Sequence, residues 1–283
     1  MTPTPRVALS PLEQLDPFVH RLCQFERDRQ SRKLIMIASE SICPRPVREA
    51  MLSEFANIYA EGYPSPRMNE LDEAALEAFD GTFVEFRRYG DRRYYKGCDY
   101  VNLVEALAKR RAAQAFANER VPQDRIFANV QPLSGAAANN AVYNAFLKPG
   151  DCIMGMDLTC GGHLTHGSEV NRSGRTYRIA AYRPGKDGRL DYEAMARLAR
   201  EWRPALLVAG FSAYPWDIDW AALRAVCDQV GAILRKSNRT LVRIVPTRMQ
   251  RTRISLFQRI QEDPTKGYKI RWNKLILVLC ILV

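Results

Sequence analysis

The chain has 283 residues, of which 47% are apolar and 26% charged, as expected for a globular protein with ample material for a core. Its seven Cys form no Cys-x-x-Cys pair, which argues against a disulfide framework or a structural zinc site and favours a reducing, cytoplasmic setting. No apolar run is long enough to cross a bilayer, and we expect no signal peptide.

The net charge of +11 is concentrated at the C-terminal end. Residues 235–283 hold 12 Lys and Arg against 2 Asp and Glu, a net +10, whereas residues 1–234 carry a net +1. The last nine residues, 275–283, are all apolar and follow a basic stretch, which leaves contact with an acidic surface open. Because no nucleic-acid motif is present, we expect no nucleic-acid partner.

Two helices are predicted near the N-terminus. The first extends from Leu12 to Arg29, where the apolar residues form a helical stripe: Leu15, Phe18, Val19, Leu22 and Phe25. The second begins after Pro44 and reaches about Ala56, with Ser39 or Ser41 as a candidate cap.

The stretch after Gly62-Tyr63-Pro64 is polar and acidic. Residues 69–79 form an acidic amphipathic segment, and a polar segment continues to Asp91, so we predict a surface helix and loop. We then expect Asp99 to cap a long scaffold helix that reaches Phe116.

The middle of the chain combines a strand, a Ser-Gly turn and the start of a helix. The predicted strand is 126–130, the turn 132–135 and the helix 136–147. The first amides of a helix have no internal partner and attract phosphate. A second strand, 152–156, leads to Gly161-Gly162-His163, where an aromatic ring stands beside backbone that can be approached closely. The pattern predicts a site for a phosphorylated aromatic cofactor.

Strands and helices continue to alternate after this site. Strands are predicted over 176–182 and 204–210, helices over 191–202 and 218–230, and a further strand begins at 231–234. This alternation predicts an α/β fold, with a mixed or parallel sheet covered by helices. Ligands of such sheets bind at the carboxyl ends of the strands.

Six motifs in this order resemble the serine hydroxymethyltransferase family, from about Leu34 to Leu234. The resemblance implies a fold-type I pyridoxal-phosphate-dependent transferase with a mixed, mostly parallel sheet. It also implies serine and glycine as substrates and tetrahydrofolate as the one-carbon carrier. The motifs are Ile37-Ala38-Ser39-Glu40, Tyr59-Ala60-Glu61-Gly62-Tyr63-Pro64, Arg93-Tyr94-Tyr95-Lys96-Gly97-Cys98, Val130-Gln131-Pro132, Gly161-Gly162-His163-Leu164-Thr165-His166-Gly167-Ser168 and Gly210-Phe211-Ser212-Ala213-Tyr214-Pro215.

The resemblance implies a set of residues that bind pyridoxal 5′-phosphate. Ser134, Gly135 and Ala136 match the phosphate turn, the His163 ring would stack on the pyridine ring, and Ser212 would bond near the phenolic oxygen. Ala136 replaces a hydroxyl residue, and the loss of one such contact costs about 1–3 kcal/mol. A lone His is more often structural, and a zinc site that uses His163 and His166 is disfavoured because no Cys or carboxylate cluster completes it.

The resemblance also implies residues that act on substrate. Tyr59 would lie near the phosphate, and Glu61 would move protons, helped by partial burial that raises a carboxyl pKa. Both would serve the partner subunit's cofactor, so we expect a homodimer or a tetramer with an N-terminal arm on the partner. With Tyr95 and His163 these are the expected catalytic residues. The expected substrate and folate contacts are Ser39, Tyr94, Tyr95, Leu158, Gly162 and Leu164.

These residue types also have ordinary structural roles. Without the family context, Glu61 would be a loop carboxylate, Ser39 a helix cap, and Tyr94 and Tyr95 packing residues at an interface. The helix from Leu12 would be a surface helix.

Two family motifs are missing after Leu234. The first is Val-Asp-x-Ala-His, whose Asp pairs with the pyridinium nitrogen, and the second is His-Lys-Thr, whose lysine holds the cofactor covalently. We therefore assign no catalytic lysine. The predicted organisation is an arm at 1–50, a large domain at 51–234 with an insertion at 65–91, and a basic tail at 235–283.

Three alternatives follow for activity. The chain is an active enzyme of this family, an inactive truncated or frameshifted subunit, or another fold-type I enzyme such as a threonine aldolase, against which the folate-side motifs argue. The tail is a frameshift product, a read-through or a basic appendage. A sheet that stops at Leu234 would have open edges and be poorly soluble.

Overall fold

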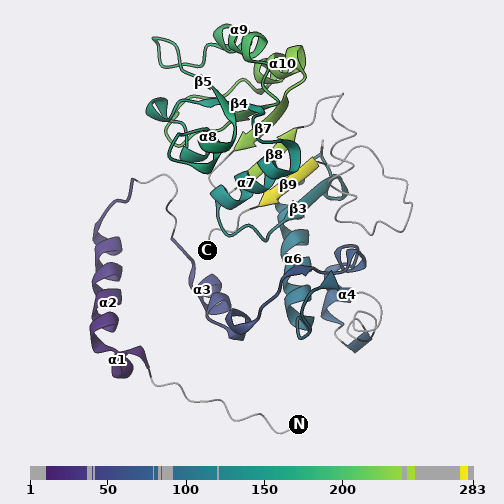
Figure 1. Cartoon of the computed structure of the whole chain (residues 1–283). Helices are drawn as coiled ribbons and strands as arrows, with labels where there is room; N and C mark the ends of the chain where they lie inside the picture. The colour runs from purple at the N-terminus through teal and green to yellow at the C-terminus, as the bar shows by residue number, and fades with distance from the viewer. Residues whose placement is uncertain are drawn as a thin grey trace. The chain divides into compact units, whose positions relative to one another are not determined.

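The computed structural model describes residues 11–36, 40, 42–78, 80–81, 84, 92–119, 121–237, 241–245 and 275–279 (Figure 1). The chain divides into two compact units, Met1–Glu40 and Ser41–Val283. In the first unit, the predicted helix is split into α1 (Leu12–Leu15) and α2 (Pro17–Arg32). The break lies at Asp16, because its side chain accepts a hydrogen bond from Val19 N (3.0 Å) and Pro17 begins the next helix.

The second unit contains a seven-stranded sheet in the order β3-β9-β8-β7-β6-β4-β5. Strands β5, β4, β6 and β7 are parallel neighbours, β8 is antiparallel to both β7 and β9, and β9 is parallel to β3. The predicted α/β fold with a mixed, mostly parallel sheet is confirmed. The strands are β3 (Ile126–Asn129), β4 (Cys152–Met156), β5 (Arg178–Tyr182), β6 (Leu206–Ala209), β7 (Ile233–Ser237), β8 (Leu241–Val245) and β9 (Leu275–Leu279).

The two strands β8 and β9 come from the basic tail. Strand β7 pairs with β6 on one side and with β8 on the other, for example Leu234 with Val245. The expectation of an open edge beside this strand is therefore wrong, because tail segments supply its backbone partners. The division of the chain into domains at residue 234 stays a prediction.

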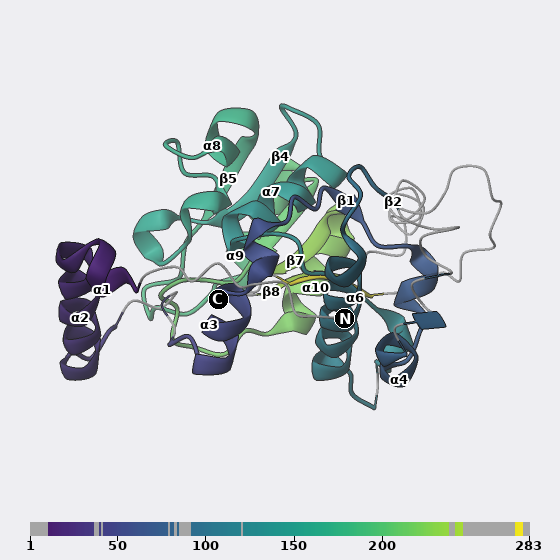
Figure 2. The ribbon, with the colours of Figure 1, turned by 90° about the horizontal axis from the view of Figure 1, so that it is seen from below.

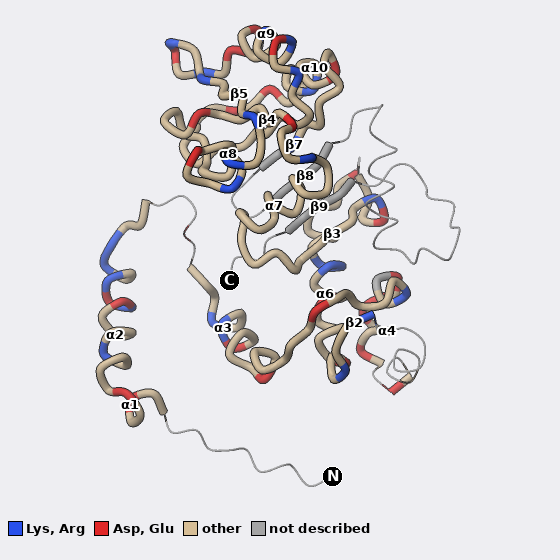
Figure 3. Tube along the Cα trace, in the orientation of Figure 1, with Lys and Arg blue, Asp and Glu red and all other residues tan. Residues whose placement is uncertain are grey.

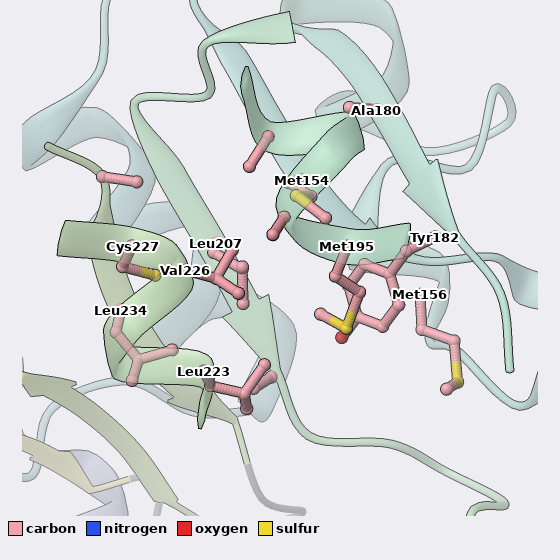
Figure 4. Packing of buried hydrophobic residues seen from close by; sticks show 14 of the residues in the cluster. Met154, Met156, Ala180, Tyr182, Met195, Leu207, Leu223, Val226, Cys227 and Leu234 are labelled. Carbon is pink, nitrogen blue, oxygen red and sulfur yellow. The ribbon is translucent and has the colours of Figure 1, made fainter. Parts of the chain in front are cut away.

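The strands present alternate residues to two helical layers. Ile153, Leu206 and Val208 face helix α7 (Gly135–Phe146). Met154 and Leu207 face the opposite layer, where α9 (Tyr192–Trp202) and α10 (Trp220–Val230) pack. Figure 4 shows this second layer, in which methionine and leucine side chains from strands and helices interlock. The alternation explains why both faces are apolar and both are covered by helices.

The shorter elements differ from prediction mainly at their ends. Helix α6 starts at Asp99 and its N-cap is Cys98, so Asp99 is not the cap. The predicted helix to Ala56 ends earlier, at Met51, before a 3-10 turn. These elements are α3 (Arg45–Met51), η1 (Glu54–Asn57), β1 (Gly62–Tyr63), η2 (Pro66–Asn69), α4 (Glu73–Glu77), β2 (Arg92–Arg93), α6 (Asp99–Phe116), η3 (Gln123–Arg125), η4 (Leu158–Cys160), η5 (Leu164–His166) and α8 (Arg172–Thr176).

The segment predicted as a surface helix and loop is partly buried. Met68 and Leu76 pack with Leu103 and Ala106 of α6 in a separate small core, and Figures 1 and 2 both place α4 beside α6. The correction has a simple cause, since the amphipathic stretch turns its apolar side toward an apolar face of α6. Within the described ranges, no helix combines the length and the hydropathy needed to span a membrane.

Candidate functional site

The start of helix α7 is the first of three segments that make up the candidate site. Ser134 is its N-cap, and the Ser134 hydroxyl accepts a hydrogen bond from Ala137 N (3.2 Å). Gly135 and Ala136 follow in the first turn, where backbone amides have no partner inside the helix. Helix α7 contains no Lys, Arg, Asp or Glu, as Figure 3 shows, so no side-chain charge of its own offsets the positive end of its dipole.

The Gly161-Gly162-His163 loop after β4 is the second segment of the candidate site. Gly161 has φ +99°, and a Cβ there would lie 2.8 Å from Ala213 O. A Cβ on Gly162 would lie only 2.1 Å from Met156 O. Both positions therefore require glycine, because neighbouring backbone fills the space of a side chain.

The residues that follow β6 are the third segment of the candidate site. Ser212 N donates to Gly161 O at 2.9 Å, and Ala213 N donates to the same oxygen at 3.3 Å. The loop that follows β4 and the loop that follows β6 are thereby joined at the carboxyl ends of two adjacent strands. Ligands of α/β sheets bind at this place.

Helix α7 is joined to the His163 loop through Thr165. Asn139 Nδ2 donates to Thr165 Oγ1 (2.5 Å), and Tyr143 Oη donates to Thr165 O (2.8 Å). His163 Nδ1 accepts from Thr165 N (3.2 Å) and lies 2.8 Å from Thr165 Oγ1. The structure therefore brings together three of the segments predicted to bind the cofactor, namely Ser134 to Ala136, His163 and Ser212.

Burial and charge both act on the two histidines of this loop. Burial lowers the pKa of His163, and the nearby Arg235 lowers it further. The pKa of His166 lies well below its usual value for the same reasons. Within the described residues neither ring nitrogen of His166 has a hydrogen-bond partner. Both rings are therefore neutral near pH 7.

Arg235 on β7 is the feature of the site that sequence reasoning missed. Its side chain is fully buried on the α7 side of the sheet, donates to Tyr143 Oη (3.0 Å) and bonds to Asn139 Oδ1. Nε has no partner in the described part of the chain, and burial lowers the pKa of the guanidinium. The alternation along β7 gave a signal, since residue 235 faces the same side as Ile233.

The residues present fit one half of a pyridoxal phosphate site. Amides at the start of α7 suit a phosphate, and the His163 loop offers a neutral aromatic ring. Strand β7, with the sequence Ile-Leu-Arg-Lys-Ser, has no carboxylate that could pair with a pyridinium nitrogen. The binding side therefore fits the cofactor, and the side that activates its ring does not.

A second group of predicted residues gathers elsewhere in the same unit. Strands β1 and β2 pair, Tyr94 N donates to Glu61 O (3.1 Å), and the rings of Tyr59 and Tyr95 meet edge to face at 4.9 Å. Tyr59 is 69% exposed and Tyr94 is 78% exposed. Glu61 is exposed as well, so its expected partial burial is absent in the single chain. Among described residues, no hydrogen bond or ring contact joins this group to the His163 loop.

Arg93 holds this second group in place and was not predicted. It is buried, and its Nη1 donates to Ala60 O (2.8 Å) and Gly62 O (2.7 Å), the two carbonyls that flank Glu61. Its other nitrogens donate to Asn102 Oδ1 (2.8 Å) and to Glu105 Oε2 (2.6 Å). Its signal in the sequence was its position directly before Tyr94 and Tyr95.

Three of the remaining predicted contacts lie in or beside the His163 loop. Leu158 and Leu164 are about half exposed and lie on either side of the buried Gly162. Ser39 lies outside the described residues. Asp157, next to Leu158, caps η4, and the pKa of its carboxyl is lowered by bonds from Thr159 and Arg183.

The chain matches the model of a known protein family. The family model described as serine hydroxymethyltransferase matches residues 12–74 and 78–245. The match covers most of the chain, including every element of the site, and continues past Leu234 through β8.

Proposed function

The chain belongs to the serine hydroxymethyltransferase family, a family of pyridoxal-phosphate-dependent transferases, and from this membership we propose that it binds pyridoxal 5′-phosphate between α7 and the His163 loop. The observation that carries the proposal is the junction of three segments. Thr165 ties α7 to the His163 loop, and Gly161 O ties that loop to Ser212. A ligand held there would meet a helix start, an aromatic ring and a hydroxyl together.

Each of these groups has a distinct role in binding. The amides of Gly135 and Ala136, with the Ser134 hydroxyl, would hold the phosphate. The neutral His163 ring would pack on the flat face of the pyridine ring, and the Ser212 hydroxyl would bond the phenolic oxygen. The bound cofactor supplies an electron sink for bonds at the amino-acid α-carbon.

The reaction we propose for the family site is the interconversion of serine and glycine, with tetrahydrofolate as the one-carbon carrier. Glu61 would move a proton on the hydroxymethyl group or the folate, with Tyr59 and Tyr95 beside it. These residues are exposed in the single chain, which supports a homodimer in which they serve the partner's site. Ser39, Tyr94, Leu158, Gly162 and Leu164 would border the amino acid and the folate.

We further propose that this chain binds the cofactor reversibly and does not turn over serine. The sequence has neither the Val-Asp-x-Ala-His motif nor the His-Lys-Thr motif. The buried Arg235 would also disfavour a positive charge on a nearby ring nitrogen, because like charges repel strongly where water is excluded. No turnover is therefore assigned to this chain, and the roles of Glu61, Tyr59 and Tyr95 are those that family membership implies for a site with both motifs.

The test is equilibrium dialysis of the purified chain against pyridoxal 5′-phosphate, beside a Gly162→Ala variant. We expect saturable binding by the parent chain and an affinity at least about tenfold lower for Gly162→Ala, because the added Cβ overlaps Met156 O. Gly81→Ala is the matched control, since a Cβ there meets nothing within 4 Å. Equal, non-saturable uptake by all three proteins would refute the binding proposal.

The proposal that this chain binds the cofactor reversibly and does not turn over serine is tested by two further measurements. Reduction with borohydride should leave no cofactor attached to lysine, and serine should yield no glycine above background when tetrahydrofolate is present. Covalent attachment together with turnover of serine would refute this proposal, because it would show that a lysine outside the family motif holds the cofactor covalently.

A further inference from the structure

Thr165 makes four hydrogen bonds from a buried position. Its side chain meets Asn139 and His163, its carbonyl accepts from Tyr143, and its amide points at the His163 ring. The residue is 1% exposed, so none of these bonds is exchanged with solvent. It is the junction between α7 and the loop that carries His163.

The directions of these bonds can be worked out from the His163 side. The amide of Thr165 can only donate, so Nδ1 of His163 must be an unprotonated acceptor. The hydroxyl of Thr165, 2.8 Å from the same nitrogen, must then donate as well. Its oxygen is left to accept, which requires the NH2 group of Asn139 to face it, at 2.5 Å.

The same directions follow from the opposite end. Arg235 can only donate, and it bonds to Oδ1 of Asn139, which turns the NH2 group of Asn139 toward Thr165. Arg235 also donates to Tyr143 Oη, so the Tyr143 proton points to the carbonyl of Thr165. The bonds therefore run in one consistent sense from β7 through α7 to the His163 ring.

We propose that Thr165, oriented by Asn139 and Tyr143, is a positioning residue that fixes His163 as the neutral tautomer with its proton on Nε2. The Nδ1 edge of the ring is held by the protein, and the ring bonds to no described residue through Nε2. The ring thus presents an uncharged face and a single N–H donor to whatever occupies the site. The functional part of this inference rests on the proposed function, because that function places the cofactor against His163.

The tautomer is measured by nitrogen-15 NMR of the histidine rings in the chain without cofactor. Only three histidines occur, and a His163→Gln variant identifies the signal of interest. We expect an unprotonated Nδ1 and a protonated Nε2 above the pKa of the ring. A ring with its proton on Nδ1, or an even mixture of tautomers, would overturn the proposal.

A pair of variants tests the hydroxyl itself. Thr165→Val keeps the branched shape but removes a bond that stabilises the neutral ring, so it should raise the pKa of His163 by about 0.5 to 1. Thr165→Ser keeps the hydroxyl and should leave that pKa near the parent value. Thr159→Val is the matched control, since the Thr159 hydroxyl bonds to Asp157 (2.7 Å) and not to His163. An unchanged pKa in Thr165→Val would refute the role of the hydroxyl.

Dialysis with pyridoxal 5′-phosphate separates this inference from the proposed function. We expect Thr165→Val to bind the cofactor several-fold more weakly than the parent chain and Thr165→Ser to bind it equally. Parent-like affinity in Thr165→Val would overturn the positioning role. If the parent shows the Nε2–H tautomer but neither the parent nor any variant binds the cofactor, the tautomer stands and the proposed function fails.

Discussion

Arg93 and Arg235 are both buried, and within the part of the chain that the structure describes only Arg93 forms an ion pair with a carboxylate. Its ion pair with Glu105 has an N–O distance of 2.6 Å, and the two side chains are 1% and 10% exposed. Gln131 Nε2 adds bonds to Glu105 Oε1 (3.0 Å) and to Gly62 O (2.8 Å). Because Arg93 bonds to Ala60 and Gly62 in the turn and to Glu105 on α6, it fixes the turn that carries Glu61 against that helix.

Removal of this arginine should be costly. In Arg93→Met we expect the free energy of unfolding to fall by about 3–5 kcal/mol, because Glu105 would remain buried without its partner. Urea unfolding measures the change. Arg45→Met is the control, since its ion pair with Glu49 is exposed on α3 and should be worth less than about 0.5 kcal/mol. Equal losses in the two variants would contradict the assigned role.

His166 should make the chain less stable in mild acid. Its pKa in the folded state lies well below the ordinary value, and the unfolded chain binds a proton near pH 6.5. The stability it contributes is therefore complete above about pH 6.5 and is lost progressively as the pH falls below that value. We expect the free energy of unfolding to drop by about 1.4 kcal/mol between pH 7.5 and pH 5.5 from this residue alone.

Urea unfolding at the two pH values measures this change. His163 acts in the same sense because its pKa is also lowered. A His166→Asn variant should show a smaller drop than the parent chain. A drop in His166→Asn that is as large as the drop in the parent chain would contradict the contribution assigned to His166.

At the scale of elements, the stretch from Pro66 to Glu77 behaves as part of the scaffold. Met68 and Leu76 are almost fully buried against α6. Arg110 Nη1 donates to Leu71 O (3.0 Å), and Arg111 pairs with Glu73. The same face of α6 is thus covered by apolar side chains in the middle and polar contacts at its border.

The burial of this stretch predicts its effect on stability. Leu76→Ala should lower the free energy of unfolding by about 2–5 kcal/mol, because it would leave a cavity beside Leu103 and Ala106. Leu52→Ala is the control, since that side chain is 85% exposed, and its effect should be under about 0.5 kcal/mol. Similar losses of unfolding free energy in the two variants would show that the stretch behaves as a surface loop.

At the scale of the whole chain, the sheet depends on segments that are far apart in the sequence. Strands β3 and β7 are not neighbours, and the backbones of β8 and β9 fill the positions between them. All four strands would have an exposed edge if these pairings were absent. Exposed edges pair readily with other chains.

Deletion of residues 238–283 should therefore cause association. We expect light scattering to show a concentration-dependent increase in mass, because β7 and β3 would each lose a partner. Deletion of residues 280–283 keeps both β8 and β9 and serves as the control. If the longer deletion keeps the mass of the parent chain at high concentration, the tail strands are dispensable.

The sequence by itself determined the fold class and located the three segments that the structure joins near the carboxyl ends of β4 and β6. Alternating strand and helix patterns are local, and so are the glycine, serine and histidine motifs, which explains why the elements fell within a few residues of their predicted places. The catalytic roles expected from the family stay predictions. Alternation along β7 indicated the face on which Arg235 lies, but its bond to Tyr143 of α7 depends on the place of the strand in the sheet.

Only the tertiary structure decided how distant residues meet. Thr165 bonds to Asn139, Arg93 bonds to the turn around Glu61, Leu76 packs on α6, and the tail pairs with β7. Periodicity specifies which face of an element is apolar, but it does not specify which other element covers that face. That choice depends on strand order and on complementary shape across the core, and both arise from contacts between residues that are far apart in the chain.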